Sequence, residues 1–376
     1  MTKNTRFILA TVLALLAFGL TTVPIYAQNP TPTPIPLGPT LKTLRSRNLL
    51  RCGINQDQIG LGYLDPNSGD VVGLQVDLCR ALAAAIFGDP AAVEFPPYSN
   101  TDAANQALKA GDVDLLIQNS PWTLSADTTG FEFGPPIFYT GEGIMVRADG
   151  GAKTWSELNS KTVCVVKGST AESEILTYAT EQKITLQLIS PSFDTIQNAW
   201  QALQDGRCDA FSAERLQLLL LQKRASDPQT YFVWDGANDI YTHEPYAPML
   251  RGDDEQWSNI VRWTMLGLVE AEQLGITSET VEILVRQVDA KTNQPETDAA
   301  YLARVGQERA NFLDPVFGIG AKLGIAPDFM RPAIIAVGNY GEIYERHFGA
   351  NADLPLARGL NNLVIKGGLM YAPDWR

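Results

Sequence analysis

Three polar segments combine residue types that could bind a small polar solute. The first covers residues 119–128, where Asn119 is followed by the hydroxyl groups of Ser120 and Thr123 on either side of Trp122. Such a set offers a ligand hydrogen bonds and a flat apolar face. The alternative interpretation is a Ser or Thr helix cap beside a core tryptophan. Residue types alone leave both interpretations open.

The second segment, residues 167–172, is typical of a turn from a strand into a helix. Ser169 and Thr170 follow a glycine, so the first N–H groups of the next helix are available to a carboxylate or phosphate. The alternative is a capping box, in which Ser169 and Glu172 satisfy those N–H groups internally.

The third segment, residues 212–215, places a carboxylate after a strand. Glu214 could pair with the ammonium group of a ligand. Its alternative role is a solvated pair with the neighbouring Arg215, which would contribute almost nothing to stability.

Residues suited to catalysis or metal binding are scarce. His243 and His347 have no nearby serine or cysteine at a spacing used for acyl transfer, and no G-x-S-x-G motif occurs. Neither HExxH nor paired CxxC motifs are present, so we expect no metal site and no cofactor. Asp253 and Asp254 are interpreted as a solvated turn.

The composition and charge of the chain exclude two classes of protein, disordered chains and nucleic-acid binders. The 376 residues are 45% hydrophobic, which is too apolar for a disordered chain. Lys and Arg number 29 against 42 Asp and Glu, for a net charge of −13, and no basic cluster is available to contact phosphates. We therefore expect no nucleic-acid partner, and the length suggests two lobes or one large α/β domain.

The first forty residues indicate export. Residues 1–27 have a charged start at Lys3 and Arg6, an apolar stretch and a small residue, Ala27, at a possible cleavage point. An uncleaved membrane anchor is the alternative. Residues 28–40 form a Pro/Thr-rich linker with alternate prolines, which favour an extended spacer. We expect the body to work in the periplasm or outside the cell, either free or associated with the membrane or wall.

The four cysteines agree with an exported chain, where an even number favours disulfides. We expect the pairs Cys52–Cys79 and Cys164–Cys208, because each then lies within one proposed lobe. Buried free thiols are the alternative.

The spacing of apolar residues predicts two similar α/β halves. In the first half, strands are expected at 49–54, 93–95 and 113–117, with helices at 76–87 and 102–110 and a loop at 61–70. In the second, strands are expected at 162–166, 185–189 and 208–211, with helices at 169–180 and 193–203. Each half contains an acidic turn that ends in an aspartate, Asp114 or Asp209, before a strand. The alternation of strands and helices in each half indicates mostly parallel sheets, with ligands bound beyond the carboxyl ends of the strands.

The remainder of the chain is predicted to be mainly helical, at 255–272, 278–288, 299–310 and 329–346. We expect two long helices that carry Trp257, Trp263 and Tyr340 to pack against the first lobe. The glycines of residues 318–324 are interpreted as a loop.

These segments resemble a known family. Residues 41–53, 76–81, 122–125 and 206–209 are similar to solute-binding proteins of amino-acid ABC importers (solute-binding protein family 3), closest to the general L-amino-acid-binding branch. The most specific stretches are residues 337–346, 356–363 and 366–373, and all four cysteines fall where that branch has them. The similarity covers residues 41–376.

The resemblance implies an α/β, two-lobed periplasmic-binding-protein type II fold with a C-terminal helical extension. Lobe 1 would comprise residues 41–146, lobe 2 residues 147–240, and residues 241–376 would return to lobe 1 and form the extension. The protein would close on a small polar solute, deliver it to the membrane subunits of an ABC permease, and act as a monomer.

The resemblance also assigns ligand-binding roles, and this chain departs from the pattern there. By similarity, the ligand-binding residues are Asn119, Ser120, Trp122, Thr123, Ser169, Thr170 and Glu214. The branch usually has an arginine that clamps the ligand carboxylate where this chain has Ala126, and a threonine where it has Pro121. Glu214 replaces an aspartate. Losing a bidentate arginine contact typically costs about 2–5 kcal/mol, so the ligand is expected to be atypical, unless another arginine such as Arg215 substitutes.

The sequence leaves three alternative functions open. The first is a binding receptor for amino acids or related nitrogen compounds, with no enzymatic activity. The second is a periplasmic enzyme that resembles cyclohexadienyl dehydratase, with Glu214 as general acid. The third is a degenerate receptor that only senses or binds a partner.

Overall fold

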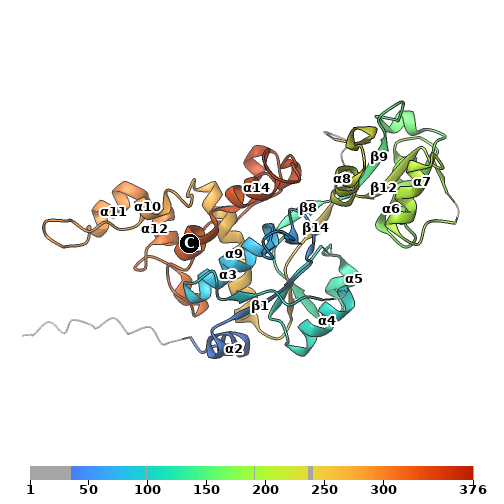
Figure 1. Ribbon diagram of the computed structural model, residues 1–376. Helices are drawn as coiled ribbons and strands as arrows, with labels where there is room; N and C mark the ends of the chain where they lie inside the picture. Colours follow the sequence, from blue (N-terminus) through green and yellow to red (C-terminus); the bar gives the residue numbers. More distant parts are fainter. Residues whose placement is uncertain (1–34, 99, 120, 190, 236–239, 376) are drawn as a thin grey trace, which may run out of the picture. The chain divides into compact units, whose positions relative to one another are not determined.

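The computed structural model describes residues 35–98, 100–119, 121–189, 191–235 and 240–375 (Figure 1). The chain divides into two units, residues 1–35 and 36–376, and the described helices and strands lie in the second. The expected leader and most of the expected linker lie outside the described residues. Within the described part, no helix is both long and apolar enough to span a bilayer.

The first sheet has five strands in the order β5-β1-β6-β15-β7. β1 is parallel to β5 and β6, whereas β15 is antiparallel to β6 and β7. Their bounds are β1 Leu50–Ile54, β5 Val93–Glu94, β6 Leu115–Ile117, β7 Phe131–Phe133 and β15 Met249–Arg251. The predicted parallel core of this half is therefore present, and a late segment of the chain returns to complete the sheet.

The second sheet repeats this plan in the order β11-β10-β12-β9-β13. β10 is parallel to β11 and β12, and β9 is antiparallel to β12 and β13. The bounds are β9 Glu142–Arg147, β10 Thr162–Cys164, β11 Gln187–Leu188, β12 Ala210–Glu214 and β13 Tyr231–Val233. β9 corrects the expected boundary of the first lobe at residue 146, because residues 142–146 pair with the second sheet.

Two short strands join these halves. β8, Phe138–Thr140, pairs in antiparallel fashion with β14, Glu244–Tyr246. We call these two strands the hinge ladder, because β8 leads directly into β9 of the second sheet and β14 leads back to β15 of the first. A fourth, small sheet is formed by β2 Asp57–Gln58, β3 Gly62–Leu64 and β4 Val71–Val72. Of these strands only β3 lies within residues 61–70, which we expected to be a loop, and residues 65–70 form the expected turn.

Helices cover both sheets. Those of the first half are α2 Pro39–Arg47, α3 Leu74–Phe87, α4 Thr101–Ala110 and α5 Leu124–Asp127, and those of the second are α6 Thr170–Glu181, α7 Ile196–Gln204 and α8 Arg215–Arg224. Short 3-10 turns include η1 Trp155–Leu158 and η2 Pro228–Thr230. The four predicted helices of the two halves are present, with ends shifted by a few residues.

The C-terminal region is helical but more broken than predicted. It comprises α9 Glu255–Gln273, α10 Val281–Leu284, α11 Asp298–Val305, α12 Gln307–Leu313, α13 Met330–Val337, α14 Tyr340–Phe348 and the 3-10 turns η4 Gly320–Leu323, η5 Gly359–Asn361 and η6 Val364–Lys366. The expected helix at 329–346 ends at Gly338, which has φ +82°, and Asn339 starts α14 with a capping box to Glu342. Gly306, with φ +83°, likewise divides the expected helix at 299–310, but α12 begins after it without a side-chain cap.

These helices share one core with the first half. Trp257 of α9 and Tyr340 of α14 are buried in the same apolar cluster as β1 and α3, and Trp263 packs against it, as predicted. The indole N–H of Trp257 donates to the carbonyl oxygen of Asp114 at 3.0 Å. Most of the C-terminal extension is thus part of the first core, whereas Tyr301, Val305 and Ala310 of α11 and α12 form a small cluster of their own.

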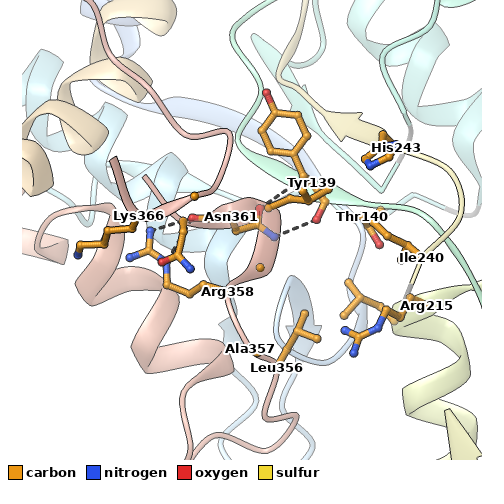
Figure 2. Close-up of a pocket in the computed structure, with 15 residues that line it drawn as sticks. Tyr139, Thr140, Arg215, Ile240, His243, Leu356, Ala357, Arg358, Asn361 and Lys366 are labelled. Carbon is orange, nitrogen blue, oxygen red and sulfur yellow. Dashed lines mark hydrogen bonds between the residues drawn. The ribbon is translucent and has the colours of Figure 1, made fainter. Parts of the chain in front are cut away.

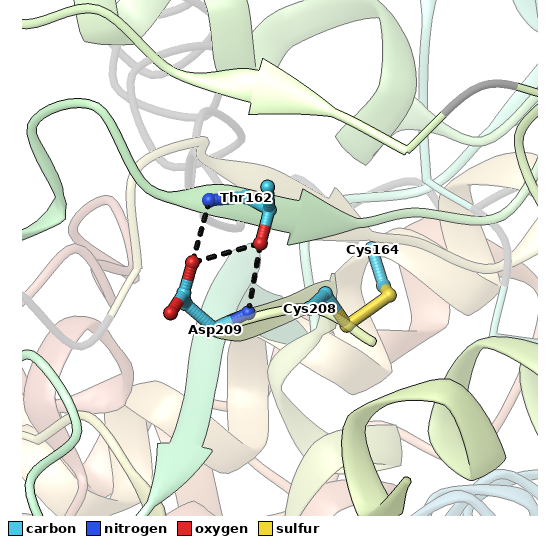
Figure 3. The surroundings of a disulfide bond; sticks show 4 residues. All are labelled: Thr162, Cys164, Cys208 and Asp209. Atoms are coloured by element: carbon cyan, nitrogen blue, oxygen red, sulfur yellow. Dashed lines mark hydrogen bonds between the residues drawn. A yellow bond between two sulfur atoms is a disulfide. The ribbon is translucent and has the colours of Figure 1, made fainter. Parts of the chain in front are cut away.

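Both acidic turns have the same structural role. The carboxylate of Asp114 accepts the backbone N–H of Arg51 at 2.7 Å, and that of Asp209 accepts the backbone N–H of Thr162 at 2.8 Å and its hydroxyl at 2.7 Å (Figure 3). Each aspartate precedes a central strand and binds the strand parallel to it. The internal similarity read from the sequence therefore reflects one repeated way of joining two strands.

Both expected disulfides are present. Cys52–Cys79 links β1 to α3, and Cys164–Cys208 links β10 to the turn before β12 (Figure 3). All four cysteines are buried, and each bond lies within one half of the fold.

Asp254 corrects the interpretation of Asp253 and Asp254 as a solvated turn. Its side chain accepts the backbone N–H of Trp257 at 3.1 Å as the N-cap of α9 and the N–H of Thr40 at 2.8 Å. It is 5% exposed, whereas the side chain of Asp253 is 70% exposed.

We expect Asp254→Ala to lower the free energy of unfolding by about 1–3 kcal/mol, because it removes a helix cap and leaves the N–H of Thr40 without its acceptor. Urea unfolding followed by tryptophan fluorescence measures the change. Asp253→Ala is the matched control and should alter stability by less than about 0.5 kcal/mol. Equal losses in the two variants would contradict this assignment.

Candidate functional site

Asn119 follows β6 and is held in a network of side-chain amides. Its oxygen accepts from Gln75 at 2.7 Å, its amide nitrogen donates to Gln58, and its backbone N–H donates to Asn55 at 3.1 Å. Both ends of the Asn119 amide therefore already have protein partners. Ser120, which was expected beside it, lies outside the described residues.

Trp122 and Thr123 take different roles. The indole of Trp122 is 38% exposed and stacks on Phe133, with ring centroids 6.0 Å apart. It is therefore not a core tryptophan, and part of it is accessible from solvent. Thr123 instead caps α5, since its hydroxyl oxygen accepts the N–H of Ala126 at 3.2 Å. The cap interpretation therefore holds for Thr123.

Ser169 and Thr170 stand at the start of α6. The Ser169 hydroxyl accepts the N–H of Glu172 at 3.2 Å and donates to the carbonyl of Val166 at 2.7 Å. The Glu172 carboxylate accepts the N–H of Gly168 at 2.7 Å. Local side chains thus accept some of the N–H groups at this helix terminus. In the expected capping box Glu172 would accept the N–H of Ser169, whereas here it accepts that of Gly168.

Glu214 ends β12 and caps α8. Its carboxylate accepts the N–H groups of Leu216 and Gln217, both at 3.1 Å, and the hydroxyl of Thr140 in β8. It is 8% exposed. Glu214 therefore links the second sheet to the hinge ladder by a hydrogen bond to Thr140. It is buried and hydrogen-bonded, and not part of the solvated pair considered from the sequence.

Two further glutamates lie beside Glu214, and sequence reasoning missed both. Glu142 of β9 stands directly opposite Glu214 in the antiparallel pairing, and Glu244 of β14 stands opposite Thr140. Glu142 is 4% exposed, and its Oε2 atom has no hydrogen-bond partner. We call Glu142, Glu214 and Glu244 the hinge glutamates. Only the strand register brings these three residues together, so no local sequence motif indicates that they are neighbours.

Burial and mutual repulsion change the acidity of the hinge glutamates. Burial, with the charges of Glu244 and Glu214, raises the pKa of Glu142 to about 8. Burial also raises the pKa of Glu214, to about 6, against the opposing effect of its three hydrogen bonds. The pKa of Glu244 is raised by burial. Glu142 is thus largely protonated at neutral pH.

A cavity of about 420 Å³ adjoins the hinge ladder (Figure 2). Its walls come from β8, the start of α8, the returning segment before β14 and the C-terminal segment. The lining residues are Tyr139, Thr140, Arg215, Leu216, Ile240, His243, residues 356–362, Lys366 and Gly367. Arg215 therefore lines a cavity to which Asn119, Trp122, Thr123, Ser169 and Thr170 do not contribute.

The expected ligand residues form two groups. Asn119, Trp122 and Thr123 follow β6 of the first sheet, whereas Ser169 and Thr170 follow β10 of the second and Glu214 ends β12. Among the described residues, no direct hydrogen bond links one group to the other. Nor does the described part of the chain contain a group of three His, Cys, Asp or Glu residues arranged to hold a metal ion.

Comparison with known proteins identifies the class. Residues 50–280 match the model of the bacterial extracellular solute-binding proteins, family 3. The chain belongs to this family and has its two-lobed type II periplasmic-binding-protein fold, with a C-terminal helical extension.

Individual relatives cover nearly the whole chain. It is 35% identical to the general L-amino acid-binding periplasmic protein AapJ of Rhizobium johnstonii, over 90% of this chain and 93% of that one. It is 34% identical, with the same coverage, to the glutamate/glutamine/aspartate/asparagine-binding protein BztA of Rhodobacter capsulatus. A periplasmic binding protein from Brucella ovis, solved with glutathione bound, is 32% identical with a TM-score of 0.71, over 90% of this chain and 100% of that one.

We expect Glu142→Gln to weaken the pH dependence of stability. The pKa of Glu142 in the folded protein, about 8, lies above its ordinary value, so the folded state binds the proton more tightly than the unfolded state. The free energy of unfolding should therefore fall as the pH rises from about 5 to 8, and less so in the variant. Urea unfolding across this pH range measures both slopes.

Glu279→Gln, which changes an exposed glutamate, is the control and should keep the slope of the unmodified protein. Identical slopes for Glu142→Gln and the unmodified protein would show that Glu142 does not hold this proton.

Proposed function

We propose that this protein is the extracytoplasmic receptor of an ABC importer and captures an amino acid or a related small nitrogen compound between its two lobes. The observation that carries the proposal is the pair of α/β sheets joined by the hinge ladder, in a chain similar to amino-acid-binding proteins over 90% of its length. Ligands of such sheets bind beyond the carboxyl ends of the parallel strands.

The ligand would contact both lobes. Trp122 offers its partly exposed indole from the first lobe, and Ser169 and Thr170 stand at the N-terminus of α6 in the second. A ligand that contacts both lobes stabilises the closed state, so capture is a shift of population toward closure. Asn119, Thr123 and Glu214 would act mainly by shaping the walls, since their side chains bind neighbouring protein groups.

The remaining parts of the proposal follow from the same family. The receptor works outside the cytoplasm as a monomer, carries out no chemistry, and hands its solute to the membrane subunits of a permease. Its ligand is a compound for which the arginine clamp is dispensable, because Ala126 occupies that position by similarity. Candidate ligands are the amino acids bound by BztA, glutathione, and amines without a carboxylate.

We expect Trp122→Ala to weaken binding of the ligand about tenfold or more, because the exposed part of the indole is lost, and to lower the melting temperature only modestly, through loss of the stacking on Phe133. Isothermal titration calorimetry, after a thermal-shift screen of the candidate ligands, measures the affinity. Leu124→Ala is the control, since Leu124 is 81% exposed two residues away. Binding that survives Trp122→Ala unchanged would remove this residue from the site, and turnover of prephenate or arogenate would favour an enzyme instead.

We also expect Ala126→Arg to strengthen binding of α-amino acids by about tenfold or more, by restoring a bidentate contact to the ligand carboxylate. Calorimetry with glutamate and glutamine tests this. Ser125→Arg places the same charge one position away on the exposed side of α5 and should give no comparable gain. Equal gains in both variants would indicate a general effect of charge.

A further inference from the structure

A second cavity, of about 260 Å³, lies in the first half of the fold beside the segment expected to bind the solute. Its walls come from α4, from β7 and β15, and from residues 118–129, which follow β6 (Figure 1). Whole small-molecule sites occupy about 300–1,000 Å³, so this cavity has room for one part of a small ligand. We call it the side pocket.

The side pocket is lined by two amides whose buried oxygens have no partner among the described residues. Gln118 lines the pocket and is 6% exposed, and its Oε1 atom accepts no hydrogen bond. Asn105 of α4 also lines the pocket, and its Oδ1 atom is likewise buried without a partner. Because a buried acceptor without a donor is unfavourable, these oxygens favour a ligand group that donates hydrogen bonds.

None of the described residues that line the side pocket is charged. Besides the two amides, the lining consists of threonines and apolar side chains, among them Phe131, Phe133 and Met249. The ammonium nitrogen of Lys109 lies 4.9 Å from the centroid of the Phe131 ring, but Lys109 is not one of the lining residues. Burying a charged group without a partner is costly, whereas a neutral polar group needs only hydrogen bonds. The pocket therefore favours an uncharged group.

The side pocket shares a wall with the segment that is expected to bind the solute. Gln118 directly follows β6, at the carboxyl end of a parallel strand, where ligands of such sheets bind. Pro121 and Ala126 line the pocket, and they are two of the positions at which this chain departs from the resembling branch. Phe133, on which Trp122 stacks, belongs to the same lining. The pocket therefore adjoins the site that we propose for the solute.

We propose that the side pocket is a subsite of the solute site and takes a primary carboxamide group of the solute, with Gln118 as its polar contact. This rests on the proposed function, because the subsite extends the site of that function. A primary carboxamide carries no charge and both donates and accepts hydrogen bonds, so it can pair with the amide of Gln118. A carboxylate has only acceptors and would face the Gln118 oxygen without a donor. The pocket thus selects amides over the corresponding acids.

Isothermal titration calorimetry of the full chain with two pairs of similar shape tests the proposal: glutamine with glutamate, and asparagine with aspartate. In at least one pair the amide should bind about tenfold or more tightly than the acid. Gln118→Met should reduce that ratio to less than about threefold, by weakening the amide and changing the acid little. Because the variant replaces an unpaired buried amide by an apolar chain of similar length, it should fold, and its melting temperature checks this.

Gln106→Met is the matched control, since Gln106 is an exposed glutamine of α4, and it should leave the ratio unchanged. Failure of both amides to bind, or no preference for the amide in either pair, overturns the proposal. A preference that survives Gln118→Met, or one that Gln106→Met reduces equally, also overturns it. Acids that bind as well as their amides leave the receptor function standing, whereas that function itself fails if no solute of the thermal-shift screen binds.

Discussion

The hinge ladder is the constraint on which the rest of this structure depends. β8 and β14 are three residues each, yet the chain passes through them into the second sheet and back to the first. Short strands hold few ladder hydrogen bonds, so side chains must reinforce the connection. Asn361 contributes two hydrogen bonds to Tyr139 from the C-terminal segment, and Glu214 contributes a third contact through Thr140. The extension therefore supports the hinge as well as the first core.

Much of the fold could be predicted from the sequence because its signals are local. Apolar spacing located the main strands and helices, and the repeated acidic turns ending in Asp114 and Asp209 indicated two similar halves, which the structure explains by equivalent hydrogen bonds between strands. The predictions that failed concerned strands whose partners lie far away in the sequence. β9 joins the second sheet through antiparallel partners more than sixty residues away, and no local pattern specifies such a register. The breaks at Gly306 and Gly338 were visible as glycines, but whether a glycine ends a helix depends on its backbone conformation.

The candidate site was predicted less well, for a physical reason. Serine, threonine and glutamate near a helix start bind either a ligand or their own helix, and the sequence pattern is the same in both cases. Thr123, Ser169 and Glu214 each cap a helix, whereas the indole of Trp122, whose N–H reaches Asp127 only at 3.4 Å, stays 38% exposed. The hinge glutamates could not have been found from sequence, since Glu142, Glu214 and Glu244 lie far apart in the chain and meet only through two strand registers.

The hinge glutamates also show how like charges can be tolerated in a buried place. Carboxylates directly opposite one another on antiparallel strands repel, and burial removes the water that would weaken that repulsion. The two positions differ in their partners. Glu214 receives two N–H groups from the start of α8 and the Thr140 hydroxyl, which favour its charged form, whereas Glu142 has an oxygen without a hydrogen-bond partner. At neutral pH the charge therefore belongs on Glu214 and the proton on Glu142, so that the cap of α8 is kept and the repulsion is removed.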